Sequence, residues 1–339
     1  MALLEIDDLH LHMASYDGDA HILAGVSLTL ERGEIRGLVG ETGCGKSLTG
    51  LSVSRLVATP PARYTAGTIR LDGRDLLACD EQQMRRLRGR RIGMIFQDPT
   101  TNLNPAFRIG EQIMDVAINA ARHDPQILGL AAGASRRDLK AAARTRAIAL
   151  LDRVGIRDAA RRIDDYPHEF SGGMRQRVLI AMALIARPDI LIADEPTTAL
   201  DVSVQAQILR LIRELVDEFS IGVLLITHNL GVVAQTCTHV SVMYAGTVVE
   251  DGPVRSIFKS PRHPYTRALL AAVPRAGIAR GELAGIAGSV PSLLDPPRGC
   301  RFAPRCPLAR PACTERPPAR TMAAEQHSVR CIVAAEAHA

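Results

Sequence analysis

The residues with the clearest chemical potential form one glycine-rich run: Gly40, Glu41, Thr42, Gly43, Cys44, Gly45, Lys46, Ser47 and Leu48. The run has the spacing G-x-x-x-x-G-K-[ST], follows an apolar segment and precedes a helical pattern over Leu48 to Val57. Glycines let backbone N–H groups curl around phosphates, and the helix N-terminus favours negative charge. Lys46 would neutralise β- and γ-phosphate charge, while Ser47 would bind Mg²⁺. The sequence therefore predicts a P-loop that binds a nucleoside triphosphate and Mg²⁺, and this motif alone is compatible with kinases, GTPases and many ATPases.

Four polar residues after apolar runs add the chemistry of hydrolysis. Asp194 follows a strand-like run and could hold Mg²⁺ through water, while Glu195 could orient and polarise an attacking water. His228 could donate a hydrogen bond to the γ-phosphate, and Gln97 could reach both the metal and the water. Each residue alone is compatible with an ordinary structural role, such as a helix cap or a core histidine. The prediction depends on their occurring in order behind the P-loop.

A small loop, Ser171-Gly172-Gly173, precedes a further helical pattern. Ser171 is suited to cap that helix, and the glycines let backbone amides approach an anion closely. The loop lies within the run from Phe170 to Arg177 and is followed by Ile190-Leu-Ile-Ala-Asp-Glu-Pro196. This pairing of a signature loop with a Walker B strand resembles the ATP-binding cassette (ABC) family. Phe170 and Met174 stand where Leu and Gln are frequent in that family, a spelling similar to that of its peptide-importer branch.

The resemblance covers roughly residues 1–258 and includes the remaining family motifs in order: Gln97 in the Q-loop, Ala199-Leu200-Asp201 in the D-loop and Thr227-His228 in the switch. It implies that Glu195, His228 and Gln97 are catalytic. It also implies that the signature loop binds the γ-phosphate held by the opposite subunit of a head-to-tail dimer. Tyr16, 30 residues before Lys46, would stack on adenine, although a lone loop tyrosine is also compatible with simple packing.

The elements that must position these residues follow from apolar patterning. Four apolar runs predict buried parallel strands: Ile35 to Val39, Ile92 to Phe96, Ile190 to Ala193 and Val223 to Ile226. Alternation around residues 26–30 and 67–73 predicts antiparallel strands, and Ser135 to Val154 reads as an amphipathic helix. The expected fold is α/β: a P-loop NTPase cassette with a parallel core sheet, an antiparallel β subdomain and a helical insertion at about 98–185.

The composition changes after residue 258, where Pro and Arg become frequent. The segment from Ser260 to Pro274 resembles the extension on the ATPase subunits of oligopeptide and dipeptide importers, and nickel-importing relatives share it. We expect a helix here that buries Leu269, Leu270 and Val273 against the cassette. The resemblance implies an ATP-hydrolysing subunit that energises peptide import across the bacterial inner membrane, with nickel or another small solute as the alternative cargo. It also implies two permease subunits, a second cassette (a copy or a different chain) and an external peptide-binding protein.

Four cysteines lie in this C-terminal extension (259–339): Cys300, Cys306, Cys313 and Cys331. Their spacing lacks the C-x2-C pairs typical of structural zinc, and a disulfide is disfavoured in a reducing cytoplasm. Four thiolates suit a [4Fe–4S] cluster, which similar tails of peptide-importer ATPases carry. Zinc and free thiols remain alternatives.

The composition excludes other classes of protein. No apolar run approaches the roughly 18 to 20 residues of a membrane span, and the N-terminus lacks a basic secretion signal. We therefore expect a peripheral protein on the cytoplasmic face of the inner membrane. The net charge of +5 is spread out and only 3% of residues are aromatic, which argues against nucleic-acid binding. A soluble ABC ATPase acting on DNA or ribosomes usually has two cassettes or a coiled coil, and a non-hydrolysing cassette would lack Glu195 or His228.

Overall fold

The structure is a computed structural model that describes residues 2–98, 101–197, 201–273 and 285–336. The chain folds into two compact units. Unit 1 comprises Met1–Glu31, Ile35–Leu77 and Leu225–Ala339, and unit 2 comprises Arg32–Glu34 and Ala78–Leu224. The P-loop and the four cysteines of the extension therefore belong to unit 1.

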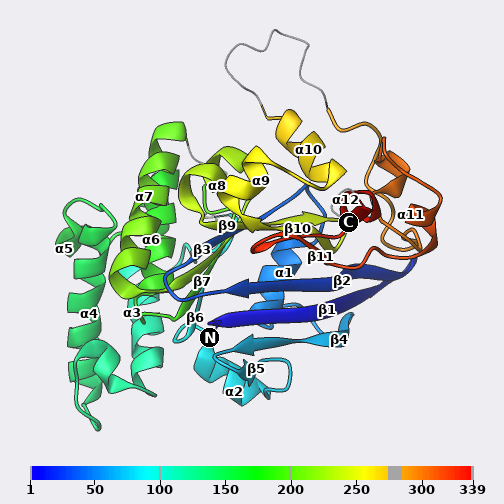
Figure 1. Cartoon of the computed structure of the whole chain (residues 1–339). Helices are drawn as coiled ribbons and strands as arrows, with labels where there is room; N and C mark the ends of the chain where they lie inside the picture. Colours follow the sequence, from blue (N-terminus) through cyan, green and yellow to red (C-terminus); the bar gives the residue numbers. More distant parts are fainter. Residues whose placement is uncertain (1, 99–100, 198–200, 274–284, 337–339) are drawn as a thin grey trace. The chain divides into compact units, whose positions relative to one another are not determined.

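Unit 1 contains an antiparallel sheet in the order β2-β1-β4-β5. Its strands are β1 (Leu4–Ser15), β2 (Gly18–Leu30), β4 (Ala62–Leu71) and β5 (Arg74–Asp75). Leu4 pairs with Leu30 on one side and with Leu71 on the other, and all three side chains are buried. This sheet is the predicted antiparallel β subdomain, drawn in blue to cyan in Figure 1.

A second sheet of unit 1 contains the strand that leads into the P-loop. In it, β3 (Ile35–Val39) runs parallel to β9 (His239–Tyr244), and β9 pairs antiparallel with β10 (Thr247–Pro253). The extension supplies β12 (His327–Val329), which pairs with β10, and β11 (Thr321–Ala324) beyond it. Every residue of β3 is buried, as expected for a parallel strand covered on both faces. The sequence did not predict the two strands of the extension.

The helices of unit 1 are short. They are α1 (Lys46–Val53), α8 (Leu230–Thr236), α9 (Val254–Lys259), α10 (Pro264–Ala271), α11 (Ala312–Glu315) and α12 (Ile332–Glu336), with a 3-10 turn η3 at Ala303–Arg305. Helix α1 ends before the predicted Val57, because Ser54 caps it and Arg55 takes a left-handed φ of 49°.

Unit 2 contains two parallel strands and the predicted helical insertion. Strands β6 (Ile92–Ile95) and β7 (Ile190–Asp194) pair in parallel, each within one residue of its predicted bounds. Strand β8 (Gly222–Ile226) begins in unit 2 and ends in unit 1. The helices are α2 (Glu81–Leu87), α3 (Ile109–Ala121), α4 (Arg136–Arg153), α5 (Ala159–Arg162), α6 (Gly172–Leu184) and α7 (Val202–Phe219), with 3-10 turns η1 (Pro125–Leu128) and η2 (Pro167–Glu169).

Helix α4 confirms the helix predicted over Ser135 to Val154. The Ser135 hydroxyl accepts a hydrogen bond from the Asp138 N–H at 3.2 Å and caps the helix. Its buried residues recur at helical spacing along one face: Ala143, Ala147, Leu150 and Leu151. Helix α4 packs against α3 and α6.

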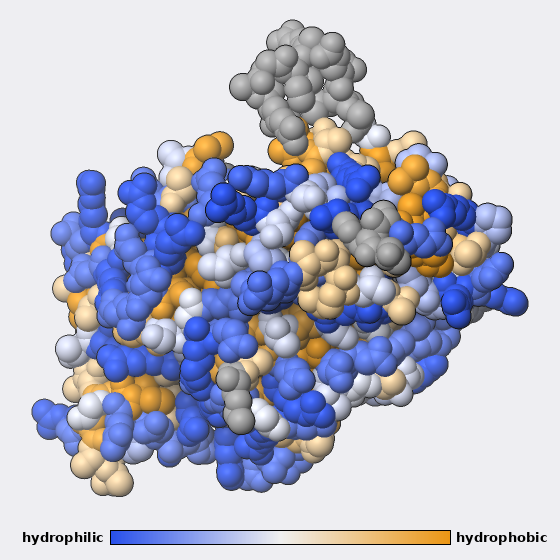
Figure 2. All heavy atoms as spheres, in the orientation of Figure 1, coloured by the Kyte–Doolittle hydropathy of each residue, from blue (hydrophilic) through white to orange (hydrophobic). Residues whose placement is uncertain are grey.

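Within the described residues, none of the helices has the length and apolar character needed to cross a membrane. Figure 2 shows a face covered largely by hydrophilic side chains, with hydrophobic residues gathered in separate patches.

Candidate nucleotide site

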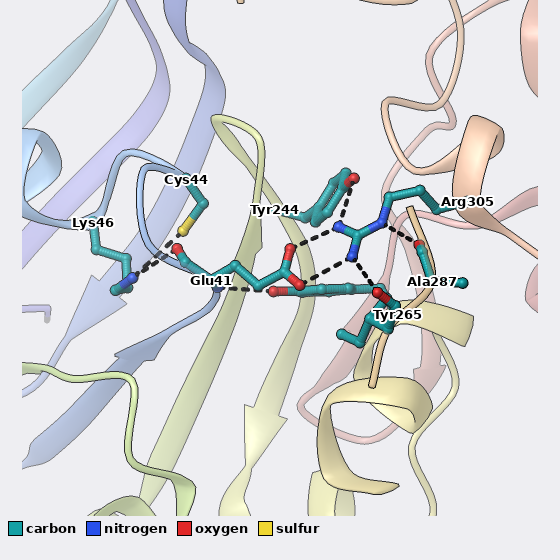
Figure 3. A network of polar contacts seen from close by, with 8 residues as sticks. Glu41, Cys44, Lys46, Tyr244, Tyr265, Ala287 and Arg305 are labelled. Atoms are coloured by element: carbon teal, nitrogen blue, oxygen red, sulfur yellow. Dashed lines mark hydrogen bonds and ion pairs between the residues drawn. The ribbon is translucent and has the colours of Figure 1, made fainter. Parts of the chain in front are cut away.

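The P-loop curls around the ammonium group of Lys46. The Lys46 Nζ donates a hydrogen bond to the Gly40 carbonyl at 2.8 Å. It also donates to the Glu41 carbonyl at 3.0 Å and lies 3.7 Å from the Cys44 Sγ (Figure 3). Gly40 has φ 154°, and a Cβ there would lie 2.0 Å from the Met243 carbonyl oxygen. Glycine is therefore required at the start of the loop, because the backbone passes too close to β9 for any side chain.

The loop ends where α1 begins, and Gly45 makes that junction possible. Gly45 has φ 103°, and a Cβ there would lie 2.8 Å from both the Leu23 and the Met243 side chains. The first residues of α1, Lys46 and Ser47, thus follow directly on a turn that only glycine can adopt. Thr42 and Gly43 at the tip are exposed, so the backbone there is open to a ligand.

Cys44 packs inside the loop. Its side chain is fully buried, and burial raises the pKa of its thiol, although Lys46 opposes this. The Cys44 carbonyl accepts a hydrogen bond from the Gly246 N–H at 2.8 Å. Cys44 is therefore a protonated packing residue rather than an exposed reactive thiol.

In unit 2 the structure brings together two of the predicted catalytic residues. The Gln97 amide donates a hydrogen bond to the Glu195 carboxylate at 3.0 Å, across the ends of β6 and β7. Asp194 ends β7 and is 6% exposed, whereas Gln97 is exposed. Glu195 has a left-handed φ of 46°, a conformation that costs a non-glycine residue energy and that recurs at functional sites.

The signature loop has the predicted helix cap. The Ser171 hydroxyl accepts a hydrogen bond from the Met174 N–H at 3.4 Å at the start of α6. Ser171 and Gly172 are exposed, and a Cβ built on Gly172 would meet nothing within 4 Å. The start of α6 is thus exposed at Ser171 and Gly172, and the N-terminus of a helix favours an anion.

The remaining predicted residues lie at loop positions. His228 follows β8 and is exposed. Tyr16 lies in the turn between β1 and β2 and is fully exposed, so its ring is accessible to a base. Asp201 caps α7 by accepting from the Val204 N–H at 2.9 Å, and the Ser203 hydroxyl lowers its pKa. The other two predicted D-loop residues, Ala199 and Leu200, lie outside the described residues. The nucleotide contacts of all these residues stay predictions.

The four cysteines of the extension line one small cavity in unit 1, together with His263 and Phe302. All four are free thiols. Burial raises the pKa of Cys300 to about 11, and it also raises the pKa of Cys306 and Cys331. Among the described residues, no group of three or more His, Cys, Asp or Glu side chains is arranged to hold a metal ion. The four thiols thus share one cavity but form no metal-binding group among the described residues, so the predicted [4Fe–4S] cluster and the zinc alternative stay predictions.

The residues that anchor α10 differ in part from those predicted. Two contacts to the P-loop were also not predicted. Leu270 is buried as predicted, but Leu269 and Val273 are only half-buried. His263, Tyr265 and Thr266, at the start of the helix, are instead almost fully buried. Tyr265 and Arg305 both contact Glu41 in the P-loop. Tyr265 lies in the segment from Ser260 to Pro274 that resembles importer ATPases, which is weak evidence for a role of this residue. No feature of the sequence indicated that Arg305 contacts the P-loop.

The fold and the P-loop define a nucleotide-binding α/β protein, and comparison with known proteins defines its family. The family model described as "ABC transporter" matches residues 23–198, and "Oligopeptide/dipeptide transporter, C-terminal region" matches residues 249–313. The chain belongs to the ABC transporter family, which confirms the resemblance drawn from the sequence.

Individual relatives agree with this assignment. The chain is 45% identical to the dipeptide transport ATP-binding protein DppD of Bacillus subtilis, over 97% of this chain and 94% of the relative. It is 48% identical to the oligopeptide transport ATP-binding protein OppD of Salmonella typhimurium, over 93% and 89% respectively. Its structure is similar to that of a dimeric ATP-binding cassette in a post-hydrolysis state bound to ADP and phosphate, with a TM-score of 0.63 and 25% identity over 74% of this chain and 99% of that chain. The predicted cassette fold is thereby confirmed.

Proposed function

We propose that this chain is the ATP-binding and ATP-hydrolysing subunit that energises import of dipeptides or oligopeptides across the bacterial inner membrane. The observation that carries the proposal is the joining of a P-loop cassette to an oligopeptide/dipeptide transporter C-terminal region in one chain. The relatives over nearly the whole chain are named as peptide transport proteins, which supports the same cargo here. Nickel or another small solute is the alternative cargo.

ATP binding rests on the P-loop. Its exposed amides and Lys46 would hold the β- and γ-phosphates, and Tyr16 would stack on the adenine. Ser47, Gln97 and Asp194 carry the oxygen donors that Mg²⁺ prefers and would hold the ion. When bound, Mg²⁺ would supply positive charge that neutralises the phosphates during transfer.

Hydrolysis is assigned to Glu195. Its carboxylate would accept a hydrogen bond from a water molecule and orient it for attack on the γ-phosphorus, so that ADP leaves and inorganic phosphate is released. The Gln97 amide that donates to Glu195 at 3.0 Å would fix the direction of this carboxylate. His228 would donate a hydrogen bond to the γ-phosphate. Tests of these roles must separate ATP binding from hydrolysis.

The chain would work in a larger assembly. The amides at Ser171 to Gly173 would bind the γ-phosphate held by a second cassette, so that ATP joins the two and hydrolysis releases them. Two permease subunits and an external peptide-binding protein would complete the transporter, with this chain peripheral on the cytoplasmic face. We propose no role in nucleic-acid binding.

The four cysteines of the extension are proposed to hold a [4Fe–4S] cluster, because all four side chains reach one cavity from separate segments. Iron and acid-labile sulfide should be measured after anaerobic purification of the full chain. About four irons per chain, lost in Cys331→Ser but retained in Cys79→Ser, are expected. One zinc without colour, or no metal at all, would contradict the proposal.

Uptake in cells tests the function as a whole. A labelled dipeptide, a longer peptide and nickel should be offered to cells that carry either the native chain or Glu195→Gln. We expect peptide uptake to collapse in the variant while nickel uptake persists. Loss of nickel uptake alone would leave the ATPase role standing and show the cargo to be wrong. No change in any uptake would refute the transport role.

A further inference from the structure

The Cys-containing extension reaches the P-loop through Arg305. This side chain lies in η3, one residue before Cys306, and is 5% exposed. Its two terminal nitrogens donate to the two oxygens of the Glu41 carboxylate, at 2.7 and 3.2 Å (Figure 3). The guanidinium also lies 5.7 Å from the centre of the Tyr244 ring and donates to the Ala287 carbonyl. A bidentate ion pair such as that of Arg305 and Glu41 fixes the orientation of the carboxylate as well as its distance from the guanidinium.

Tyr265 contacts the same P-loop residue from α10. Its hydroxyl accepts a hydrogen bond from the Glu41 backbone N–H at 2.9 Å, and its side chain is fully buried. The rings of Tyr244 and Phe302 pack against the Tyr265 ring, at centroid distances of 4.6 and 5.4 Å. Glu41 is therefore held by its amide and its carboxylate, in both cases by residues C-terminal to the core of the cassette.

The opposite side of Glu41 faces the nucleotide-binding lysine. The carbonyls of Gly40 and Glu41 accept the hydrogen bonds of the Lys46 ammonium, at 2.8 and 3.0 Å. A shift of the Glu41 peptide would move one of the two groups that set the position of this ammonium. Arg305 and Tyr265 thus both contact the P-loop at Glu41.

The charge of Glu41 gives the pair a second effect. A carboxylate in a loop that wraps a triphosphate repels the ligand, and the repulsion is strong where water is excluded. Arg305 cancels this charge, and the Glu41 hydrogen bonds raise the pKa of Arg305 further, so the guanidinium is always positive. Without Arg305 an uncompensated negative charge would lie within the phosphate-binding loop.

We propose that Arg305 and Tyr265 are positioning residues for ATP binding: they hold Glu41, and Arg305 also neutralises it so that the loop accepts the triphosphate. This inference rests on the proposed binding of ATP. It gives the extension a role in nucleotide affinity that is separate from any metal at the cysteines.

The experiment measures ATP and ADP affinity of the full-length chain by equilibrium binding, together with thermal unfolding. Arg305→Met should weaken ATP binding about tenfold and ADP binding less, because ADP has less negative charge. Adding Glu41→Gln to this variant removes the uncompensated carboxylate and should restore much of the lost ATP affinity. Arg305→Lys keeps the charge and should bind ATP better than Arg305→Met.

The matched control is Arg310→Met, which removes an exposed ion pair to Glu336 in the same extension and should leave both affinities unchanged. Tyr265→Phe keeps the packed ring, loses only the acceptor for the Glu41 N–H, and should weaken ATP binding a few-fold. Equal losses of ATP and ADP affinity in Arg305→Met, or no recovery in the double variant, would overturn the proposal. Failure of the native chain to bind ATP would instead refute the proposed function.

Discussion

The P-loop and the C-terminal extension differ in how far apart in the sequence their functional residues lie. The P-loop gathers its functional groups from nine consecutive residues, Gly40 to Leu48, and backbone geometry aims them inward. The extension gathers its cysteines from four separate positions, and its Arg305 acts on a residue 264 positions earlier. A local motif thus carries its own geometry, whereas the extension depends on the sheet and helices on which it packs. Four experiments test how far this contrast holds.

The largest effect is expected for Glu195→Gln in unit 2. Removing the carboxylate should lower the rate of ATP hydrolysis by about 10²–10⁴-fold, the usual contribution of a general base, while ATP binding persists. Steady-state ATPase assays and equilibrium binding on the same preparation measure both. A variant that hydrolyses at the native rate would place the catalytic base elsewhere.

Asp251→Ala tests how firmly the extension is attached. Asp251 in β10 accepts hydrogen bonds from Arg36 at 2.7 Å, Ser241 at 2.6 Å and Arg320 at 3.2 Å, and the last belongs to the extension. Removing the buried carboxylate that pairs with Arg36 should lower the free energy of unfolding by about 3 kcal/mol. Chemical denaturation measures this change. The exposed pair of Arg63 and Asp19 offers a control, for which Arg63→Met should lower the free energy of unfolding much less than Asp251→Ala does.

The third experiment is a pH titration of His263. Burial lowers the pKa of this imidazole to about 4 from its ordinary value of 6.5, although Glu250 opposes the shift. Between these values the unfolded chain binds a proton that the folded chain does not, so stability should fall as the pH falls from 6.5 towards 4. The expected slope is about 1 kcal/mol per pH unit.

His263→Asn is the variant that isolates this slope. Asparagine retains an acceptor for the Tyr265 N–H, which His263 Nδ1 accepts at 3.0 Å at the start of α10. Denaturation curves at several pH values should show a shallower fall in stability than in the native chain. An unchanged slope would mean that another group titrates.

The smallest effect is expected at the adenine. Tyr16→Ala should weaken ATP binding by about tenfold, as for loss of one base-stacking aromatic, and should leave thermal unfolding unchanged because the ring is fully exposed. Tyr16→Phe, which keeps the stacking face, serves as the control. Native affinity in Tyr16→Ala would show that the ring only occupies the turn.

Much of the cassette could be predicted from the sequence, because its signals are local. Strands β3, β6, β7 and β8 lie within one residue of their predicted bounds, since a run of apolar residues on a doubly covered strand needs no knowledge of its neighbours. The Ser171 cap and the P-loop turn at Gly45 likewise follow from residue type alone.

Only the tertiary structure determined the role of the extension. Its strands β11 and β12 are short; β12 pairs with β10, and β11 pairs with β12. Strands this short have too few residues for an alternating pattern that would predict them. Leu269 and Val273 are only half-buried, in contrast to the prediction, whereas His263 and Tyr265 at the start of α10 are almost fully buried. The sequence by itself determined the nucleotide-binding loop, because its function is built from adjacent backbone groups. The pairing of Arg305 with Glu41 was decided by the tertiary structure, since an ion pair between distant segments produces no local pattern in the sequence of either segment.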